Sequence, residues 1–243
     1  MAADGQRHIL AIGGFGAPRQ QDLRLPALIG HALELSGAAK PRVCVLNTAA
    51  GDEPTAYVRM YSMLAQHGAR PSHLQLFSMP NVADPADLLL SQDVIFVGGG
   101  SVANMVAVWR AHGLDEVFRQ AWAAGIVLTG VSAGALCWFL SGTTDSFGLA
   151  LRPFTAGLGF LPGSYCPHYS AEPTRRPAYQ ALVGDGTLPA GIACDDGTAA
   201  HFAGTELAGI VADKPGVTGY QVRPDGSGGI HEEPLKVTTL LPG

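Results

Sequence analysis

One short motif has the residue types and spacing of a serine nucleophile. Ser132 lies between Gly130 and Gly134, at the end of the apolar run 126–129. In a Gly-x-Ser-x-Gly elbow, a strand ends in a tight turn, small residues flank the serine, and a helix follows at once. The N–H groups and positive dipole at the start of that helix would face a developing oxyanion. We therefore predict Ser132 as the nucleophile of an acyl transfer, with a small helix-capping serine as the alternative.

A serine nucleophile needs a base that takes its proton. Of the eight histidines, six lie beside predicted helices, at the start of the first strand or in the polar C-terminal segment. The remaining two are His168, in a loop between Pro167 and Tyr169, and His201, which follows a strand-like run and could face solvent. We favour His168, because loops after the elbow can return over the ends of the strands.

The base in turn needs a carboxylate that holds it in the right tautomer. Asp195 and Asp196 follow an apolar run and precede Gly197. The end of a strand is a place from which side chains reach a site. The same residues could instead form an Asp-Gly turn that bonds to its own backbone, and both interpretations stay open.

An oxyanion hole needs two N–H donors that converge on one point. Ala133 follows the nucleophile and would supply one of them. Gly98, Gly99 and Gly100 end another apolar run, where glycine lets the backbone approach a substrate closely. We expect Gly99 to supply the second donor, with an ordinary glycine-rich turn as the alternative.

The glycine clusters do not predict a nucleotide cofactor. No Gly-Lys-Ser/Thr follows residues 98–100, and the glycine spacing in residues 13–16 differs from that of a dinucleotide fingerprint. The separations of Cys166, His168, Cys194 and Asp195 match no known zinc pattern. We therefore expect a reaction without an organic cofactor and without a metal.

The composition narrows the class of protein. The chain has 243 residues, 47% of them hydrophobic and 14% charged, with a net charge of −5. This favours one compact domain over residues 1–243, and the lack of a Lys/Arg stripe argues against nucleic acid as a partner. The first eight residues lack the apolar core of a signal peptide, and no apolar run reaches the roughly 18 residues that span a membrane. The four cysteines are widely spaced, as in buried thiols of a cytoplasmic protein.

Short apolar runs alternate with helical stretches along the first half of the chain. Such a pattern predicts a parallel sheet that is covered on both faces, joined by short glycine-bearing turns. Strands are predicted at 8–12, 42–46, 74–77, 93–97 and 126–129, and helices at 23–36, 55–66, 86–90, 102–111 and 114–124. After residue 141, loops lead to a helix at 177–183 and to short, partly antiparallel strands at 191–194, 198–202, 207–212 and 219–222.

These motifs together resemble the peptidase E family of serine peptidases, the aspartyl dipeptidases related to cyanophycinase. The resemblance covers about residues 8 to 222. It is carried by 97–100 with 103–105 and 109–110, by 130–135 with 137–139 and 144–146, and by 167–169 with 195–197. It implies a three-layer α/β/α sandwich with a mainly parallel central sheet, similar to a class I glutamine amidotransferase domain and flavodoxin-like. It also implies a triad of Ser132, His168 and Asp196, with Asp195 as the alternative acid, because several members carry glutamate at the second position.

The resemblance further implies a substrate class. Family members cleave short peptides, above all dipeptides with an N-terminal aspartate, whose carboxylate needs a cation. Arg175 and Arg176 are the candidates, since a guanidinium grips a carboxylate with two hydrogen bonds; a solvated helix start is the alternative. Gly100 and Ser101 would border the substrate, although many members have asparagine where Ser101 stands.

Other functions stay open on the same scaffold. They are an isoaspartyl or cyanophycin-type peptidase, an amidase, and a sensor that binds acidic peptides without cleaving them. Asp145 and Ser146 would shape the site or make a turn. The expected partner is a short peptide rather than nucleic acid or a membrane, and the exposed edge of the sheet could support a homodimer.

Overall fold

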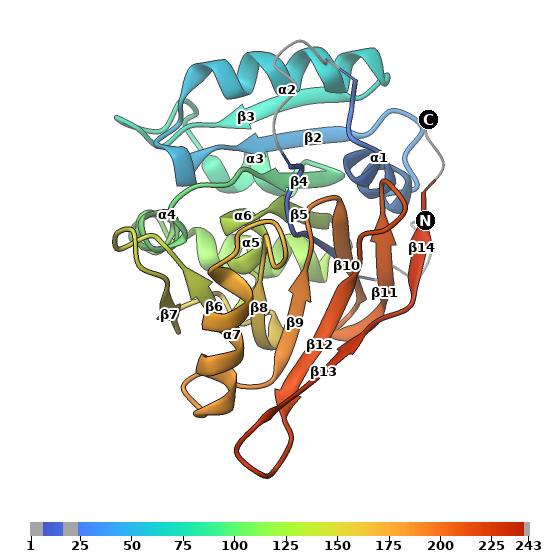
Figure 1. Cartoon of the computed structure of the whole chain (residues 1–243). Coiled ribbons are helices and arrows are strands. Elements are labelled where there is room, and N and C mark those ends of the chain that lie inside the picture. Colours follow the sequence, from blue (N-terminus) through green and yellow to red (C-terminus); the bar gives the residue numbers. More distant parts are fainter. Residues whose placement is uncertain (1–6, 17–23, 241–243) are drawn as a thin grey trace.

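The computed structural model describes residues 7–16 and 24–240. Within these ranges, an eight-stranded sheet has the order β14-β11-β10-β1-β5-β4-β2-β3 (Figure 1). The neighbours from β3 to β1 are parallel, whereas β10 runs antiparallel to both β1 and β11. The strands are β1 (His8–Ile12), β2 (Arg42–Leu46), β3 (Arg70–Leu74), β4 (Val94–Val97), β5 (Val127–Val131), β10 (Thr198–Ala203), β11 (Glu206–Ala212) and β14 (Val237–Thr239).

Helices cover both faces of this sheet, because the side chains of each strand alternate between two buried clusters. Leu10 and Ile12 belong to the cluster with α1 (Ala27–Leu35) and α2 (Pro54–Gln66). Ile9 and Ala11 belong to the cluster with α3 (Pro85–Leu90), α4 (Val102–Ala111) and α5 (Leu114–Ala123). The predicted α/β/α sandwich with a mainly parallel sheet is therefore confirmed.

The second half of the chain adds a six-stranded sheet with the order β13-β12-β9-β8-β6-β7. Its neighbours β6, β8 and β9 are parallel, and the other pairs are antiparallel. Helix α7 (Arg175–Gly184) packs on it through Tyr179 and Val183 (Figure 1). The strands are β6 (Phe139–Thr144), β7 (Arg152–Phe154), β8 (Leu161–Cys166), β9 (Gly191–Cys194), β12 (Gly219–Pro224) and β13 (Ile230–Pro234).

Two of the predicted segments differ from the structure. The helix predicted directly after Ser132 is present but short, because α6 (Ala133–Leu136) has only four residues. Residues 141–166 were expected to be loops, but they contain most of β6 together with β7 and β8. Glycine in β6 suggested a turn; at Gly142 a Cβ would lie 2.0 Å from the Tyr165 carbonyl oxygen, so the close contact between strands requires glycine there.

The third predicted strand is wrong in position. It was placed at 74–77, whereas β3 covers Arg70–Leu74. β3 is the edge strand, where Pro71 and half-buried polar residues are tolerated, so it lacks the apolar run of a central strand. The predicted helix start at Leu23 and most of the N-terminal segment considered as a signal peptide lie outside the described residues. No helix in the described ranges is long and apolar enough to cross a membrane. All four cysteines are free and buried, as predicted.

Candidate active site

Ser132 lies directly after β5, at the sheet edge where the parallel strands end. Its backbone has φ 56° and ψ −114°, a conformation that L-residues rarely adopt and that nucleophile elbows impose. The flanking glycines are required by packing. A Cβ at Gly130 would lie 2.3 Å from the Gly134 carbonyl oxygen, and one at Gly134 would lie 2.3 Å from the Val97 carbonyl oxygen.

His168 reaches Ser132 from the loop after β8. Its Nε2 lies 2.8 Å from Ser132 Oγ, and its Nδ1 lies 2.6 Å from Asp196 Oδ1. The His168 and Asp196 side chains are 22% and 16% exposed, so the pair is largely shielded from water. With the ring proton on Nδ1, the imidazole donates to the carboxylate and accepts from the serine hydroxyl. This arrangement can activate the hydroxyl for attack on a carbonyl carbon.

The two adjacent aspartates point to different partners. Asp195 is 8% exposed, and its carboxylate accepts hydrogen bonds from the backbone N–H groups of Ser170 and Thr218, each at 3.2 Å. It therefore joins the His168 loop to the segment before β12. Asp196, not Asp195, is the acid that the structure brings to the imidazole.

Gly14 is a residue of the site that the sequence reasoning missed. A Cβ there would lie 1.9 Å from Asp196 Oδ1 and 2.5 Å from His168 Nδ1, so only glycine leaves room for the pair. The backbone of this turn also holds the loop, because the His168 N–H donates to the Gly13 carbonyl oxygen at 3.3 Å. The available signal was the glycine cluster at the end of the first strand, which was considered only as a nucleotide motif.

Gly99 borders the nucleophile from the end of β4. A Cβ at this position would lie 3.4 Å from Ser132 Cβ and 4.0 Å from its Oγ. Within the described part of the chain, the N–H groups of Gly99 and Ala133 donate no hydrogen bond. Both are thus available to a ligand beside Ser132. Gly100 has φ 137° and packs against Ala49, and the Ser101 hydroxyl caps α4 by accepting from the Asn104 N–H.

Both candidate arginines are held by carboxylates of the protein. Arg175 is 3% exposed; its Nε donates to Glu172, and its Nη2 lies 3.5 Å from Asp145. Arg176 is bound to Glu232 on β13. Ser146, beside Asp145, accepts a hydrogen bond from the Ala103 N–H and so ties the β6–β7 loop to α4.

A cavity of about 1030 Å³ adjoins the candidate active site. Gly98, Gly99 and Val131 form its wall near Ser132, and it continues between α1 and α2. Its size is at the upper end of the range for small-ligand pockets. Asp213 is one of its lining residues, and burial raises the pKa of the Asp213 carboxyl. Among the described residues, no three His, Cys, Asp or Glu side chains are arranged to hold a metal ion.

Known proteins resemble the chain in sequence and in fold. The sequence profile of peptidase family S51 matches residues 9–210. YgaJ of Bacillus subtilis (strain 168), an uncharacterized peptidase, is 41% identical over 218 residues, which are 89% of this chain and 92% of YgaJ. Peptidase E of Shewanella denitrificans is 29% identical over 165 residues, 64% of this chain and 69% of that protein. The crystal structure of a peptidase from an acI-B1 actinobacterium shares the fold, with a TM-score of 0.66 at 19% identity, and covers 96% of this chain and 95% of its own.

Proposed function

Because the chain belongs to peptidase family S51, we propose that it is a serine peptidase whose catalytic triad is Ser132, His168 and Asp196. One observation carries the proposal. Two consecutive hydrogen bonds, of 2.8 and 2.6 Å, run from the serine hydroxyl through the imidazole to the carboxylate. This is the nucleophile–base–acid relation that peptide-bond cleavage by a serine requires.

Each group then has one role in the reaction. Ser132 Oγ attacks the peptide carbonyl carbon while His168 Nε2 takes its proton. The oxyanion accepts hydrogen bonds from the N–H groups of Gly99 and Ala133. His168 returns the proton to the leaving amine, which leaves an acyl-enzyme, and a water molecule that His168 activates releases the acid. Asp196 keeps the ring proton on Nδ1 and stabilises the imidazolium.

The proposed substrate is a short peptide, with an N-terminal aspartate preferred. The family resemblance supports this preference. The paired state of Arg175 and Arg176 does not add to it, since a substrate carboxylate would have to compete with Glu172, Asp145 or Glu232 for a guanidinium. A panel of Asp-X, Glu-X, β-Asp-X and N-blocked peptides tests the preference and separates it from isoaspartyl peptidase and amidase activity.

Replacement of the nucleophile tests the mechanism. We expect Ser132→Ala to lower kcat by several orders of magnitude, because the loss of a triad nucleophile removes the covalent route. Its melting temperature should stay close to that of the wild type. Ser62→Ala, which changes a serine on α2, is the matched control and should keep full activity.

Labelling separates an enzyme from a sensor. A fluorophosphonate should modify the wild type at Ser132 and leave Ser132→Ala unmodified. Peptide turnover at the wild-type rate by Ser132→Ala, or a wild type that the probe does not label, would remove the proposal.

A further inference from the structure

Glu232 lies outside the segment that the family profile matches, yet it is connected to the candidate base. It stands on β13, beyond residue 210. Its carboxylate accepts hydrogen bonds from the Tyr169 hydroxyl, from the Arg176 guanidinium and from Gln180 Nε2, the last at 2.7 Å. The side chain is only 14% exposed. These donors lower the pKa of the Glu232 carboxyl despite its burial, so it is ionised at neutral pH.

Tyr169 is the residue that follows His168. It is fully buried, with its ring packed edge-on against Tyr179 at 6.1 Å and tilted against Tyr220 at 5.3 Å. Its N–H donates to the Cys194 carbonyl oxygen at 3.1 Å. Ring, hydroxyl and backbone therefore fix Tyr169 at three points. One of these points is the carboxylate of Glu232.

His168 needs such support because its own backbone is strained. Its φ is 54°, in the left-handed region that non-glycine residues avoid. A conformation of this kind persists only where the surrounding structure holds it. The imidazole must also stay within hydrogen-bond distance of both Ser132 and Asp196, and small displacements of catalytic groups are costly.

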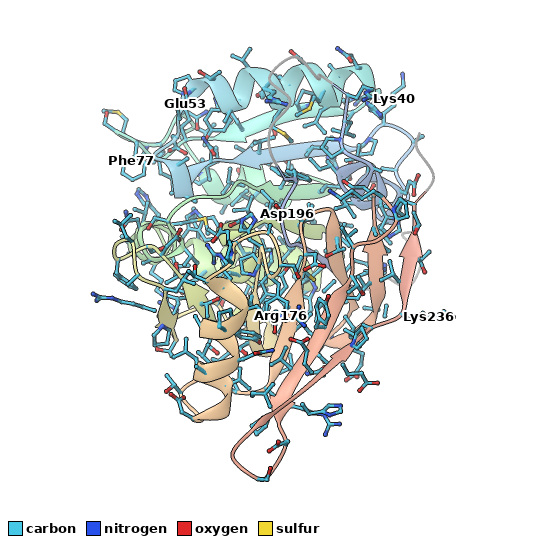
Figure 2. All side chains as sticks on the ribbon, viewed as in Figure 1. Lys40, Glu53, Phe77, Arg176, Asp196 and Lys236 are labelled. Carbon is cyan, nitrogen blue, oxygen red and sulfur yellow. The ribbon has the colours of Figure 1, made fainter. Side chains whose placement is uncertain are left out.

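Arg176 belongs to the same cluster of side chains, which consists of Glu232 and its partners Tyr169, Arg176 and Gln180. Its guanidinium carbon lies 5.4 Å from the centre of the Tyr169 ring and 5.2 Å from that of Tyr220, while its nitrogens bind Glu232. Cation–π contacts and the ion pair thus place the guanidinium in the cluster (Figure 2 labels Arg176, which lies on α7). The predicted substrate contact of Arg176 stays a prediction.

We propose that Glu232 is a positioning residue for His168, acting through Tyr169, and that Arg176 serves the same cluster. The inference rests on the proposed function, since it assumes that His168 is the base. It assigns the hairpin of β12 and β13 a part in catalysis. The hairpin would act by holding the base loop rather than by touching the substrate.

The main test compares two neighbouring glutamates on β13. Glu232→Gln removes the charge from the cluster, and Glu233→Gln makes the same change at a side chain that is 60% exposed. We expect Glu232→Gln to lower kcat by about 10- to 100-fold, as for a misplaced catalytic group, with KM changed by less than about twofold. Fluorophosphonate labelling should slow in parallel. Glu233→Gln should match the wild type in both measurements.

Two further measurements exclude a merely structural effect. The downfield NMR resonance of the His168 Nδ1 proton should weaken or shift in Glu232→Gln at a temperature where its circular dichroism equals that of the wild type. Tyr169→Phe, which removes only the hydroxyl, should lower kcat in the same way. It provides the test if Glu232→Gln fails to fold.

Arg176→Gln distinguishes positioning from substrate binding. A positioning role predicts an equal fall in kcat for Asp-X and Leu-X peptides. A rise in KM confined to Asp-X peptides would overturn the inference for Arg176. If Glu232→Gln and Tyr169→Phe both keep the wild-type kcat and the wild-type rate of fluorophosphonate labelling, the inference that Glu232 positions His168 would be overturned. If instead Ser132→Ala stays active, the proposed triad is at fault.

Discussion

At the residue scale, the carboxylates of Asp195 and Asp196 have different environments, although the two residues are adjacent in the chain. Asp196 is hydrogen-bonded to the His168 imidazole. Asp195 accepts hydrogen bonds from two backbone N–H groups, one from a segment before it in the chain and one from a segment after it. A carboxylate oriented on an imidazole supports proton transfer. A carboxylate that satisfies buried N–H groups supports the fold, because an unpaired buried donor is costly.

Asparagine at each position should separate these two roles. Asp196→Asn should lower kcat by about 10⁴-fold, because the amide favours the wrong imidazole tautomer. Asp195→Asn should keep most of the activity and lose about 1–2 kcal/mol of unfolding free energy through weaker hydrogen bonds to the Ser170 and Thr218 N–H groups. Kinetics and urea denaturation of both variants measure the two effects. The reverse pattern would identify Asp195 as the acid.

At the element scale, the ends of three adjacent strands of the large sheet border the candidate site, while His168 and Asp196 reach it from the loops after β8 and β9 of the second sheet. β1 is followed by the glycine turn that packs against His168, β5 is followed by Ser132, and β4 is followed by Gly98 and Gly99. Parallel strands deliver these turns to one edge of the sheet. Glycine is needed at the turn after β1 because the His168–Asp196 pair occupies the space of a side chain.

A single methyl group tests this packing. Gly14→Ala should reduce kcat by about 100-fold or more, because its Cβ would overlap Asp196 Oδ1 and move the Asp196 carboxylate and the His168 imidazole out of hydrogen-bonding position. Gly30→Ala is the matched control. Gly30 lies on α1, and among the described residues a Cβ there would meet no atom within 4 Å outside the helix's own backbone. Activity should therefore be unchanged, and the helix should be more stable by about 0.5–1 kcal/mol. Full activity of Gly14→Ala would show that the loop can move aside.

At the scale of the whole molecule, one core cluster contains residues of both sheets, among them Leu128 of β5 and Tyr165 of β8. This continuity supports the prediction of a single domain, which stays a prediction. A group of three histidines lies at the start of β1, the end of the strand opposite Gly14, and His31 of this group also lines the cavity. His8 Nδ1 is 3.0 Å from His201 Nε2, the His31 ring lies edge-on to His201 at 5.7 Å, and Glu34 is 3.5 Å from His31.

We expect this histidine group to make the stability of the fold depend on pH. Burial, followed by the proximity of His8 and His31, lowers the pKa of His201 from 6.5 to about 4. Between pH 4 and 6.5 the unfolded chain binds a proton at His201 and the folded chain does not. The contribution of His201 to the free energy of unfolding is therefore fully present above about pH 6.5 and falls as the pH drops toward 4. The loss from this residue should be on the order of 1–2 kcal/mol.

Thermal unfolding between pH 7.5 and 4.5 measures this dependence. His201→Asn should flatten the profile relative to the wild type. His231→Asn, at a side chain that is 46% exposed, should leave the profile unchanged. An unaltered slope in His201→Asn would assign the pH dependence to other groups.

The sequence alone predicted the family, the α/β/α sandwich and the positions of most strands and helices in the first half of the chain. These features follow from local patterns: buried parallel strands are apolar runs, and the elbow needs glycines at fixed distances from Ser132. The sequence also selected Ser132 and His168, which lie within hydrogen-bond distance although 36 residues separate them. Their roles stay proposals.

Only the tertiary structure distinguished Asp196 from Asp195, placed Gly14 against the His168 imidazole and joined Glu232 to the loop that carries His168. Each of these facts is a contact between residues far apart in the chain, such as the 63 positions between Tyr169 and Glu232. Such contacts leave no periodic or spacing signal. They arise when two sheets and α7 pack together, and packing alone decides which carboxylate meets an imidazole, a backbone N–H or a guanidinium.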